Sequence, residues 1–214
     1  TMRSAGPMAR TVDEVIDLYR VLSRPDARDT WSLPPETVDL LDTDLAPDGL
    51  RVGVLTDLGP GYPLDPRVEA IVRTAAATLA GGGADVVDVP APFDVDPYPA
   101  LDRVFQVRAR AEWEALAPER RELVLPAVAE WASAAAGFGA VDHVGDLAAV
   151  DAAQSRLRAA LAGYDIVVAP VIPTPGFGAE EVGLYPDRPL AHCTYTAWFN
   201  QTGQPASTLC FGFV

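Results

Sequence analysis

A strand–helix–strand unit of about forty residues constrains the fold of this chain more than any other feature. The apolar run 50–55 predicts a buried strand, and residues 66–80 carry apolar side chains at helical spacing. Three glycines at 81–83 end that helix, and the β-branched run 85–89 predicts a second strand. Two strands separated by a single helix are parallel and joined by a right-handed crossover.

The segments before this unit predict one helix and one long loop. Residues 12–23 carry apolar positions at helical spacing, and Thr11 with Glu14 three residues later forms a capping box. Residues 24–49 are rich in proline and aspartate, which predicts a surface loop with at most a short helix near 35–42.

The second half of the chain alternates helices and strands. Alanine-rich stretches predict helices near 98–117, 119–135 and 146–162. The apolar run 166–170 is typical of a strand covered by helices on both faces. A helix or loop over 194–205 and a last strand over 206–212 complete the pattern. We therefore expect a single α/β domain over residues 1–214, with three α/β/α layers around a central mixed, largely parallel sheet.

The composition of the chain excludes several classes of binding partner. The chain has a formal net charge of −14, and all 16 of its basic residues are arginine. Nucleic acid and anionic membranes need clustered basic residues, so neither is an expected partner. No apolar run reaches the roughly 18 residues that span a bilayer. Only Cys193 and Cys210 are present, not as a CxxC pair, and a reducing cytoplasm is the expected compartment.

No metal, cofactor or nucleophile site is evident. Gly81-Gly82-Gly83 precedes a strand, whereas a phosphate-binding loop follows one, and no cofactor is expected. His143 and His192 lack partners at metal-ligand spacing. The serines lie in no GxSxG or SxxK motif, and a chain without lysine cannot perform serine–lysine catalysis. A Cys–His pair through Cys193 or Cys210 stays formally open, although a small apolar packing role is the commoner one.

Aromatic and proline residues gather where the predicted strand 166–170 ends. The segment 170–176 leaves the strand end at which α/β sheets place their binding crevices. Tyr195, Trp198 and Phe199 follow close to the next such edge. Core packing under a rigid loop and the wall of an apolar pocket both fit this pattern, with Thr174 among the polar groups that would orient a ligand.

Three segments resemble the second half of the amidase signature family. They are Gly6-Pro7-Met8-Ala9-Arg10 before a helix, the strand Tyr164-Asp165-Ile166-Val167-Val168-Ala169-Pro170, and Asn200 with Gly203-Gln204-Pro205-Ala206. The resemblance implies a mixed-sheet α/β/α fold and a Ser–cis-Ser–Lys triad that forms an acyl-enzyme from an amide. The triad would belong to a half preceding Thr1, so no catalytic residue is expected in this chain. This half would contribute part of the substrate pocket, for which Ile172, Thr174 and Trp198 are the candidates.

Three functions remain open on this resemblance. The first is part of an amide hydrolase, with a small-molecule amide as substrate and the N-terminal half of the same protein as partner. The second is a catalytically inactive amidase-like binding or scaffold protein. The third is an A-type glutamine amidotransferase component, but Cys193 stands where that branch has an acidic residue, which favours an apolar or aryl amide over glutamine. A homodimer is left open.

Overall fold

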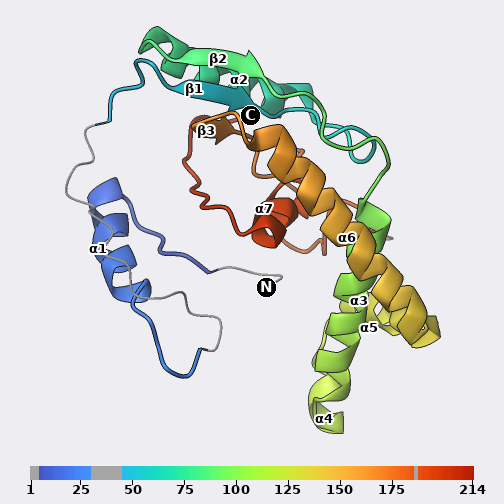
Figure 1. Cartoon of the computed structure of the whole chain (residues 1–214). Coiled ribbons are helices and arrows are strands. Elements are labelled where there is room, and N and C mark those ends of the chain that lie inside the picture. The colour runs from blue at the N-terminus through green and yellow to red at the C-terminus, as the bar shows by residue number, and fades with distance from the viewer. Residues whose placement is uncertain (1–4, 30–44, 186–187) are drawn as a thin grey trace. The chain divides into compact units, whose positions relative to one another are not determined.

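The computed structural model describes residues 5–29, 45–185 and 188–214 (Figure 1). Contacts within the chain separate it into two compact units, residues 1–46 and residues 47–214. Each unit is described by itself below. The prediction of a single domain over 1–214 stays a prediction.

The first unit contains helix α1, Val12–Leu22. The Thr11 hydroxyl accepts from the Glu14 backbone N–H at 3.3 Å, and the Glu14 carboxylate accepts from the Thr11 N–H at 3.3 Å. The predicted capping box is therefore confirmed. No residue of α1 is buried, and Val12 and Leu22 are 61% and 63% exposed. The short helix predicted near 35–42 lies outside the described residues.

The second unit is built on a small parallel sheet. Strand β1, Arg51–Val54, pairs with β2, Asp85–Asp88, and with β3, Ile166–Val168, in the order β2-β1-β3. Helix α2, Pro66–Gly81, connects β1 to β2, so the predicted strand–helix–strand unit is confirmed. All three strands are parallel, and within the described residues the sheet contains no antiparallel strand.

As the α/β class predicts, helix α2 packs against all three strands of the parallel sheet (Figure 1). On the α2 side, Val54 of β1 packs with Val72 and Ala76 of α2, joined by Val86 and Val168 from the neighbouring strands. Helix α6, Ala140–Leu161, leads into β3 on the other side. Burial of these apolar side chains between α2 and the strands stabilises the short sheet.

Helices between β2 and β3 form a separate packed layer. Helix α3, Tyr98–Glu114, contacts both α6 and α5, Pro126–Ser133. The helix predicted near 119–135 is in fact two, α4, Pro118–Arg121, and α5, followed by the 3₁₀ turn η1, Ala134–Gly137. Leu125 is extended because it precedes Pro126, whose ring excludes the helical conformation from the preceding residue. Helix α6 begins six residues before its predicted start, with Asp142 capping the Gly139 N–H.

The C-terminal segment departs from the prediction. The 3₁₀ turn η2, Ala191–Cys193, and helix α7, Thr196–Thr202, precede Gly203, which ends the helix with φ 68°. The predicted strand over 206–212 is wrong, because residues 203–214 have no regular secondary structure. Strand propensity needs a neighbouring strand to become a ladder, and this segment lies instead where a side chain on Gly212 would meet Ile71 of α2.

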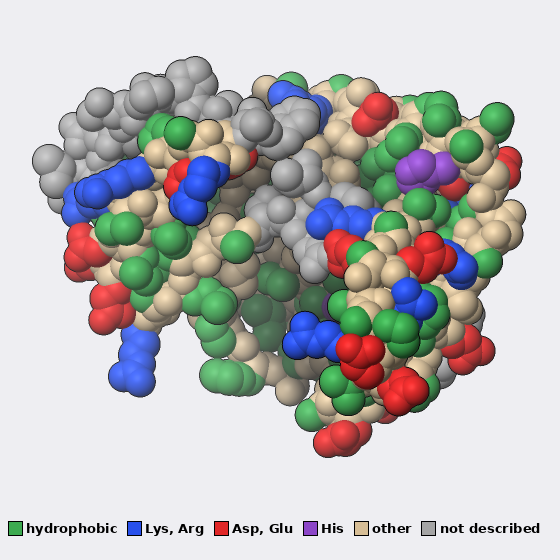
Figure 2. Space-filling model, turned by 90° about the horizontal axis from the view of Figure 1, so that it is seen from below, with side chains coloured by type: hydrophobic (Ala, Val, Ile, Leu, Met, Phe, Trp, Pro, Cys, Tyr) green, Lys and Arg blue, Asp and Glu red, His purple; other side chains and the backbone are tan. Residues whose placement is uncertain are grey.

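Charges of both signs are mixed on one face of the molecule. Figure 2 shows arginine and carboxylate side chains interspersed with hydrophobic ones on this face. Within the described part of the chain, no helix is both long and apolar enough to cross a membrane.

We expect Gly53→Ala to destabilise the second unit. A Cβ on Gly53 would lie 2.6 Å from the Val89 Cγ2 and 2.9 Å from the Tyr164 ring, so β1 has no room for a methyl group. Overpacking of this kind costs about 1–3 kcal/mol in free energy of unfolding, measured by urea denaturation. Gly81→Ala is the matched control, because a Cβ there meets nothing within 4 Å. Equal unfolding midpoints for the two variants would contradict the prediction.

Candidate functional site

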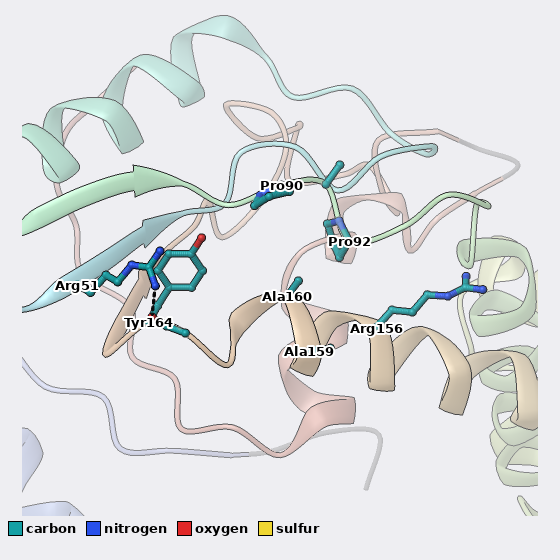
Figure 3. Close-up of a pocket in the computed structure, with 9 residues that line it drawn as sticks. Arg51, Pro90, Pro92, Arg156, Ala159, Ala160 and Tyr164 are labelled. Carbon is teal, nitrogen blue, oxygen red and sulfur yellow. Dashed lines mark hydrogen bonds between the residues drawn. The ribbon is translucent and has the colours of Figure 1, made fainter.

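A hollow of about 490 Å³ lies between the start of β1, the loop after β2 and the last turns of α6 (Figure 3). Its walls are mainly apolar, and two arginines belong to it. The lining residues are Arg51, Pro90, Ala91, Pro92, Arg156, Ala159, Ala160, Gly163 and Tyr164.

Arg51 is held in a defined position in this hollow. Its guanidinium lies 5.1 Å from the centre of the Tyr164 ring, and its Nη1 donates to the Gly163 carbonyl at 3.2 Å. The Arg51 backbone N–H donates to the Asp165 carboxylate at 2.8 Å. At the other end, Arg156 pairs with Asp94 at 2.7 Å.

The carboxyl edge of the sheet is the second place where a site is expected. Strand β1 connects through α2 to β2 on one side and pairs with β3 on the other, and ligands of open α/β sheets bind at the carboxyl ends of the strands. Two hydrogen bonds join the loops there: Leu55 N–H to the Val168 carbonyl at 2.9 Å, and Asp65 N–H to the Pro173 carbonyl at 2.8 Å.

The loops after β1 and β2 also touch closely. Gly59 has φ 91°, and a Cβ there would lie 2.1 Å from the Phe93 carbonyl oxygen, so only glycine fits. The Phe93 N–H donates to the Leu58 carbonyl at 3.2 Å. These two loops therefore lie in direct contact and together form the rim of the carboxyl edge.

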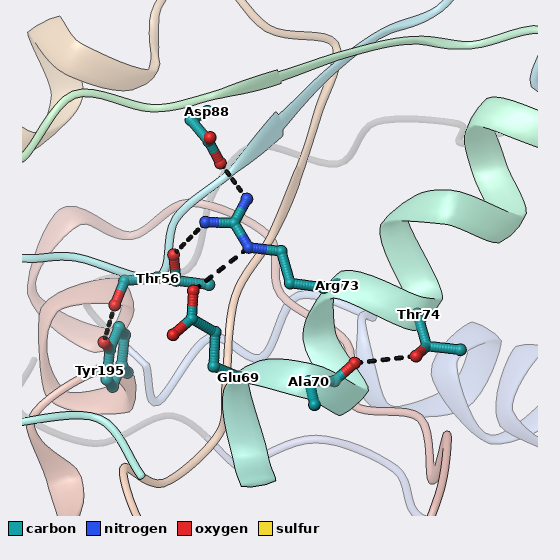
Figure 4. A network of polar contacts seen from close by, with 7 residues as sticks. All are labelled: Thr56, Glu69, Ala70, Arg73, Thr74, Asp88 and Tyr195. Carbon is teal, nitrogen blue, oxygen red and sulfur yellow. Dashed lines mark hydrogen bonds and ion pairs between the residues drawn. The ribbon is translucent and has the colours of Figure 1, made fainter. Parts of the chain in front are cut away.

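A polar network supports this rim from the α2 side (Figure 4). Arg73 of α2 makes ion pairs with Asp88, at the end of β2, and with Glu69, and it donates to the Thr56 hydroxyl at 3.1 Å. The Tyr195 hydroxyl donates to the Thr56 carbonyl at 2.7 Å, which ties the start of α7 to the end of β1. Burial raises the pKa of Tyr195 above its ordinary range, so this phenol stays protonated.

A small cleft separates the rim from α7. Trp198 is only 2% exposed, and its ring centre lies 5.1 Å from that of Phe93. The cleft has a volume of about 10 Å³, which is room for a water molecule and no more. Burial also raises the pKa of Tyr98, another of its lining side chains.

The structure places the predicted site residues in two segments after β3. Trp198 lines the small cleft, whereas Ile172 and Thr174 lie in the segment after β3, both half-buried. The Thr174 hydroxyl accepts from the Gly176 N–H at 3.5 Å. Their role in a substrate pocket stays a prediction.

Two further titratable side chains, Asp102 and Cys193, have pKa values that are shifted by burial. Burial raises the pKa of Asp102, although the Trp131 Nε1–H, which donates to its carboxylate at 3.2 Å, acts in the opposite direction. Burial likewise raises the pKa of the Cys193 thiol, which disfavours a thiolate nucleophile. In the part of the chain that the structure describes, no three His, Cys, Asp or Glu side chains are grouped so as to hold a metal ion.

Comparison with known proteins decides the family. The sequence model of the amidase family matches residues 1–214, the whole of this chain. The chain belongs to the amidase family. Its segments at 6–10, 164–170 and 200–206 thus carry a family pattern, and the α/β architecture is the one this family shares.

Curated relatives of this amidase-family chain include two kinds of enzyme. It is 28% identical to the A-type component of the glutamyl-tRNA(Gln) amidotransferase of Synechococcus sp. (strain CC9902), covering 100% of this chain and 48% of the relative. It is 27% identical to an amidase of Pseudomonas putida, covering 97% of this chain and 46% of the relative. The chain thus spans about half the length of these relatives.

Solved structures show the same fold. A 6-aminohexanoate cyclic dimer hydrolase complexed with substrate superposes with a TM-score of 0.65 at 22% identity, covering 88% of this chain and 44% of that one. The A-type component of the glutamyl-tRNA(Gln) amidotransferase of Thermotoga maritima gives a TM-score of 0.62 at 17% identity, covering 92% and 43%.

Sequence reasoning missed the Arg73–Thr56–Tyr195 network and the hollow at Arg51. Arg73 lies on the polar face of an amphipathic helix, where an arginine carries no local signal of its partners. Tyr195 lies 139 positions from Thr56. Only the presence of a charged residue, Arg51, within the otherwise apolar predicted strand 50–55 could have drawn attention to the hollow.

We expect Tyr195→Phe to lower the free energy of unfolding by about 1 kcal/mol, because it removes the hydroxyl that the Thr56 carbonyl accepts. Thermal or urea unfolding measures the loss. Tyr19→Phe removes the same atom from a side chain that is 43% exposed and should change nothing. An unchanged midpoint in Tyr195→Phe would show that the bond does not hold α7.

Asp102→Asn should stabilise the chain at pH 7 and leave it unchanged at low pH. The folded-state pKa of Asp102 is raised, so its contribution is fully favourable below the unfolded value of 3.8 and is lost as the pH rises through the folded pKa. Asparagine stays neutral and still accepts from the Trp131 Nε1–H. Urea midpoints at pH 7 and pH 3.5 test this, with Glu130→Gln, an exposed carboxylate on α5, as control. Destabilisation at pH 7 would refute it.

Proposed function

We propose that this chain is part of an amide-bond hydrolase that converts a carboxamide into a carboxylate and ammonia or an amine. The match of the amidase family over residues 1–214 is the observation that carries the proposal. In this role the chain supplies scaffold and part of the substrate pocket, at Ile172, Thr174 and Trp198, and it does not supply the nucleophile.

The lack of lysine supports the division of roles. A serine–lysine mechanism needs a neutral lysine as base, and all 16 basic residues here are arginine, which does not lose its proton in proteins. The serine, second serine and lysine therefore come from the other half of the enzyme. The exposed apolar side chains Val12 and Leu22 of α1, and those of Leu209 and Phe213, fit a chain that such a half covers.

The amidotransferase alternative is favoured by the names of several relatives and disfavoured by one residue. Relatives named as the A-type component of a glutamyl-tRNA(Gln) amidotransferase match this chain, one over its full length. Cys193, half-buried in η2 with a raised thiol pKa, would be a neutral group at a place where glutamine recognition uses an acid. An apolar or aryl amide suits this neutral position better than glutamine does.

The test compares the chain alone with the chain assembled with the serine–lysine half of the same protein. Release of ammonia or amine is measured on an aryl acetamide, an aliphatic carboxamide and glutamine. We expect no turnover by residues 1–214 alone and hydrolysis of the aryl or aliphatic amide by the assembly. Replacing the lysine of the added half with methionine should abolish that activity.

Three other outcomes are informative. Turnover by residues 1–214 alone would overturn the assignment of the nucleophile to the other half. An assembled protein that hydrolyses none of the amides would favour the inactive binding or scaffold role. Hydrolysis of glutamine alone would favour the amidotransferase role.

A further inference from the structure

We infer that the hollow between β1, the loop after β2 and the end of α6 binds a small monocarboxylate with an apolar body. The carboxylate would lie on the Arg51 guanidinium beside Tyr164, with the apolar body between the prolines and alanines of the walls (Figure 3). The inference uses only the residues of this hollow and holds whether or not the proposed function does.

Arg51 provides the charge that selects an anion. A guanidinium has five N–H donors, and the contact of its Nη1 with the Gly163 carbonyl uses one of them. Among the described residues, no carboxylate forms an ion pair with this guanidinium. The nearby Asp165 carboxylate accepts from the backbone N–H of Arg51 and not from its side chain. Guanidinium and carboxylate match in shape and can form two parallel hydrogen bonds.

The arginine is also held in place before a ligand arrives. Its backbone pairs with that of Asp85 in β2. Its guanidinium donates a hydrogen bond to the Gly163 carbonyl and lies over the Tyr164 ring, 5.1 Å from the ring centre. Cation–π contact of this kind favours one side-chain position. Binding then costs less side-chain entropy than it would at a free surface arginine.

The rest of the hollow selects a single charge and an apolar body. Arg156, the other cation in the walls, is paired with Asp94 at 2.7 Å. A second carboxylate on the ligand would therefore compete with Asp94, which favours a monocarboxylate. Pro90, Pro92 and the alanines of α6 offer rings and methyl groups, and a volume of about 490 Å³ lies within the usual 300–1,000 Å³ of small-molecule sites.

Benzoate is the probe that fits this description, and benzamide is its uncharged control of the same shape. Each is titrated into the full chain and followed by ¹H–¹⁵N NMR, including the arginine Nε–H signals. We expect saturable binding of benzoate with a dissociation constant on the order of 1 mM and at least about tenfold weaker binding of benzamide. Because the Arg51 side chain is exposed, raising the salt concentration should weaken benzoate binding.

Three variants locate the site. Arg51→Gln removes the cation and should reduce benzoate binding at least about tenfold. Ala159→Leu fills the hollow from an exposed helical position and should block binding without changing charge. Arg158→Gln removes a cation from the same helix but outside the hollow and should bind benzoate as the unchanged chain does. Circular dichroism confirms that each variant is folded.

Several results would overturn the inference. They are benzamide binding as tightly as benzoate, Arg51→Gln retaining full affinity, or no saturation below about 50 mM, well above the range of specific small-molecule sites. Loss of binding in Arg158→Gln equal to that in Arg51→Gln would show general attraction of an anion to arginine rather than a site. Retained binding in Ala159→Leu would place the ligand elsewhere.

Discussion

The second unit depends on the position of β1 between two parallel neighbours. Its backbone groups bond to β2 on one side and β3 on the other, and it packs against α2 on one face. Gly53 lets the other face come within contact of Val89 and the Tyr164 ring. A strand of four residues can hold this place only because every one of its sides is occupied. The rim loops, the network at Arg73 and the hollow at Arg51 are all attached to its two ends.

Both candidate sites follow from this arrangement, at opposite ends of the strand. At its start, Arg51 meets the turn that leads from α6 into β3, and the uncovered space beside it forms the hollow. At its end, Thr56 receives contacts from α2 and from the start of α7. The end facing the carboxyl edge is packed tightly around Trp198, whereas the other end keeps open volume. The match to the amidase family covers residues 1–214 and does not depend on which end of β1 binds a ligand.

Elements set by local rules could be predicted from the sequence, and those set by distant partners could not. The Thr11–Glu14 capping box and the strand–helix–strand unit are confirmed. Their sequence signals come from residues that are close together along the chain. The break before Pro126 was not predicted, because the alanine-rich stretch 119–135 favours one continuous helix. The strand predicted over 206–212 was wrong because apolar alternation does not supply a neighbouring strand. The role of Trp198 in a substrate pocket stays a prediction from its position after a strand, whereas the hollow at Arg51 joins three segments with no common signal in the sequence.

The bond between Tyr195 and Thr56 also bears on the order in which the chain folds. It joins residues 139 positions apart, and β1 cannot pair with β3 until more than a hundred residues have followed it. Contacts of such long sequence separation are reached slowly, because a large loop must close before any of them forms. During synthesis, β1 and α2 would therefore wait with one edge of the strand unpaired while α3 to α6 emerge. This interval is when the nascent chain is most open to pairing with another molecule.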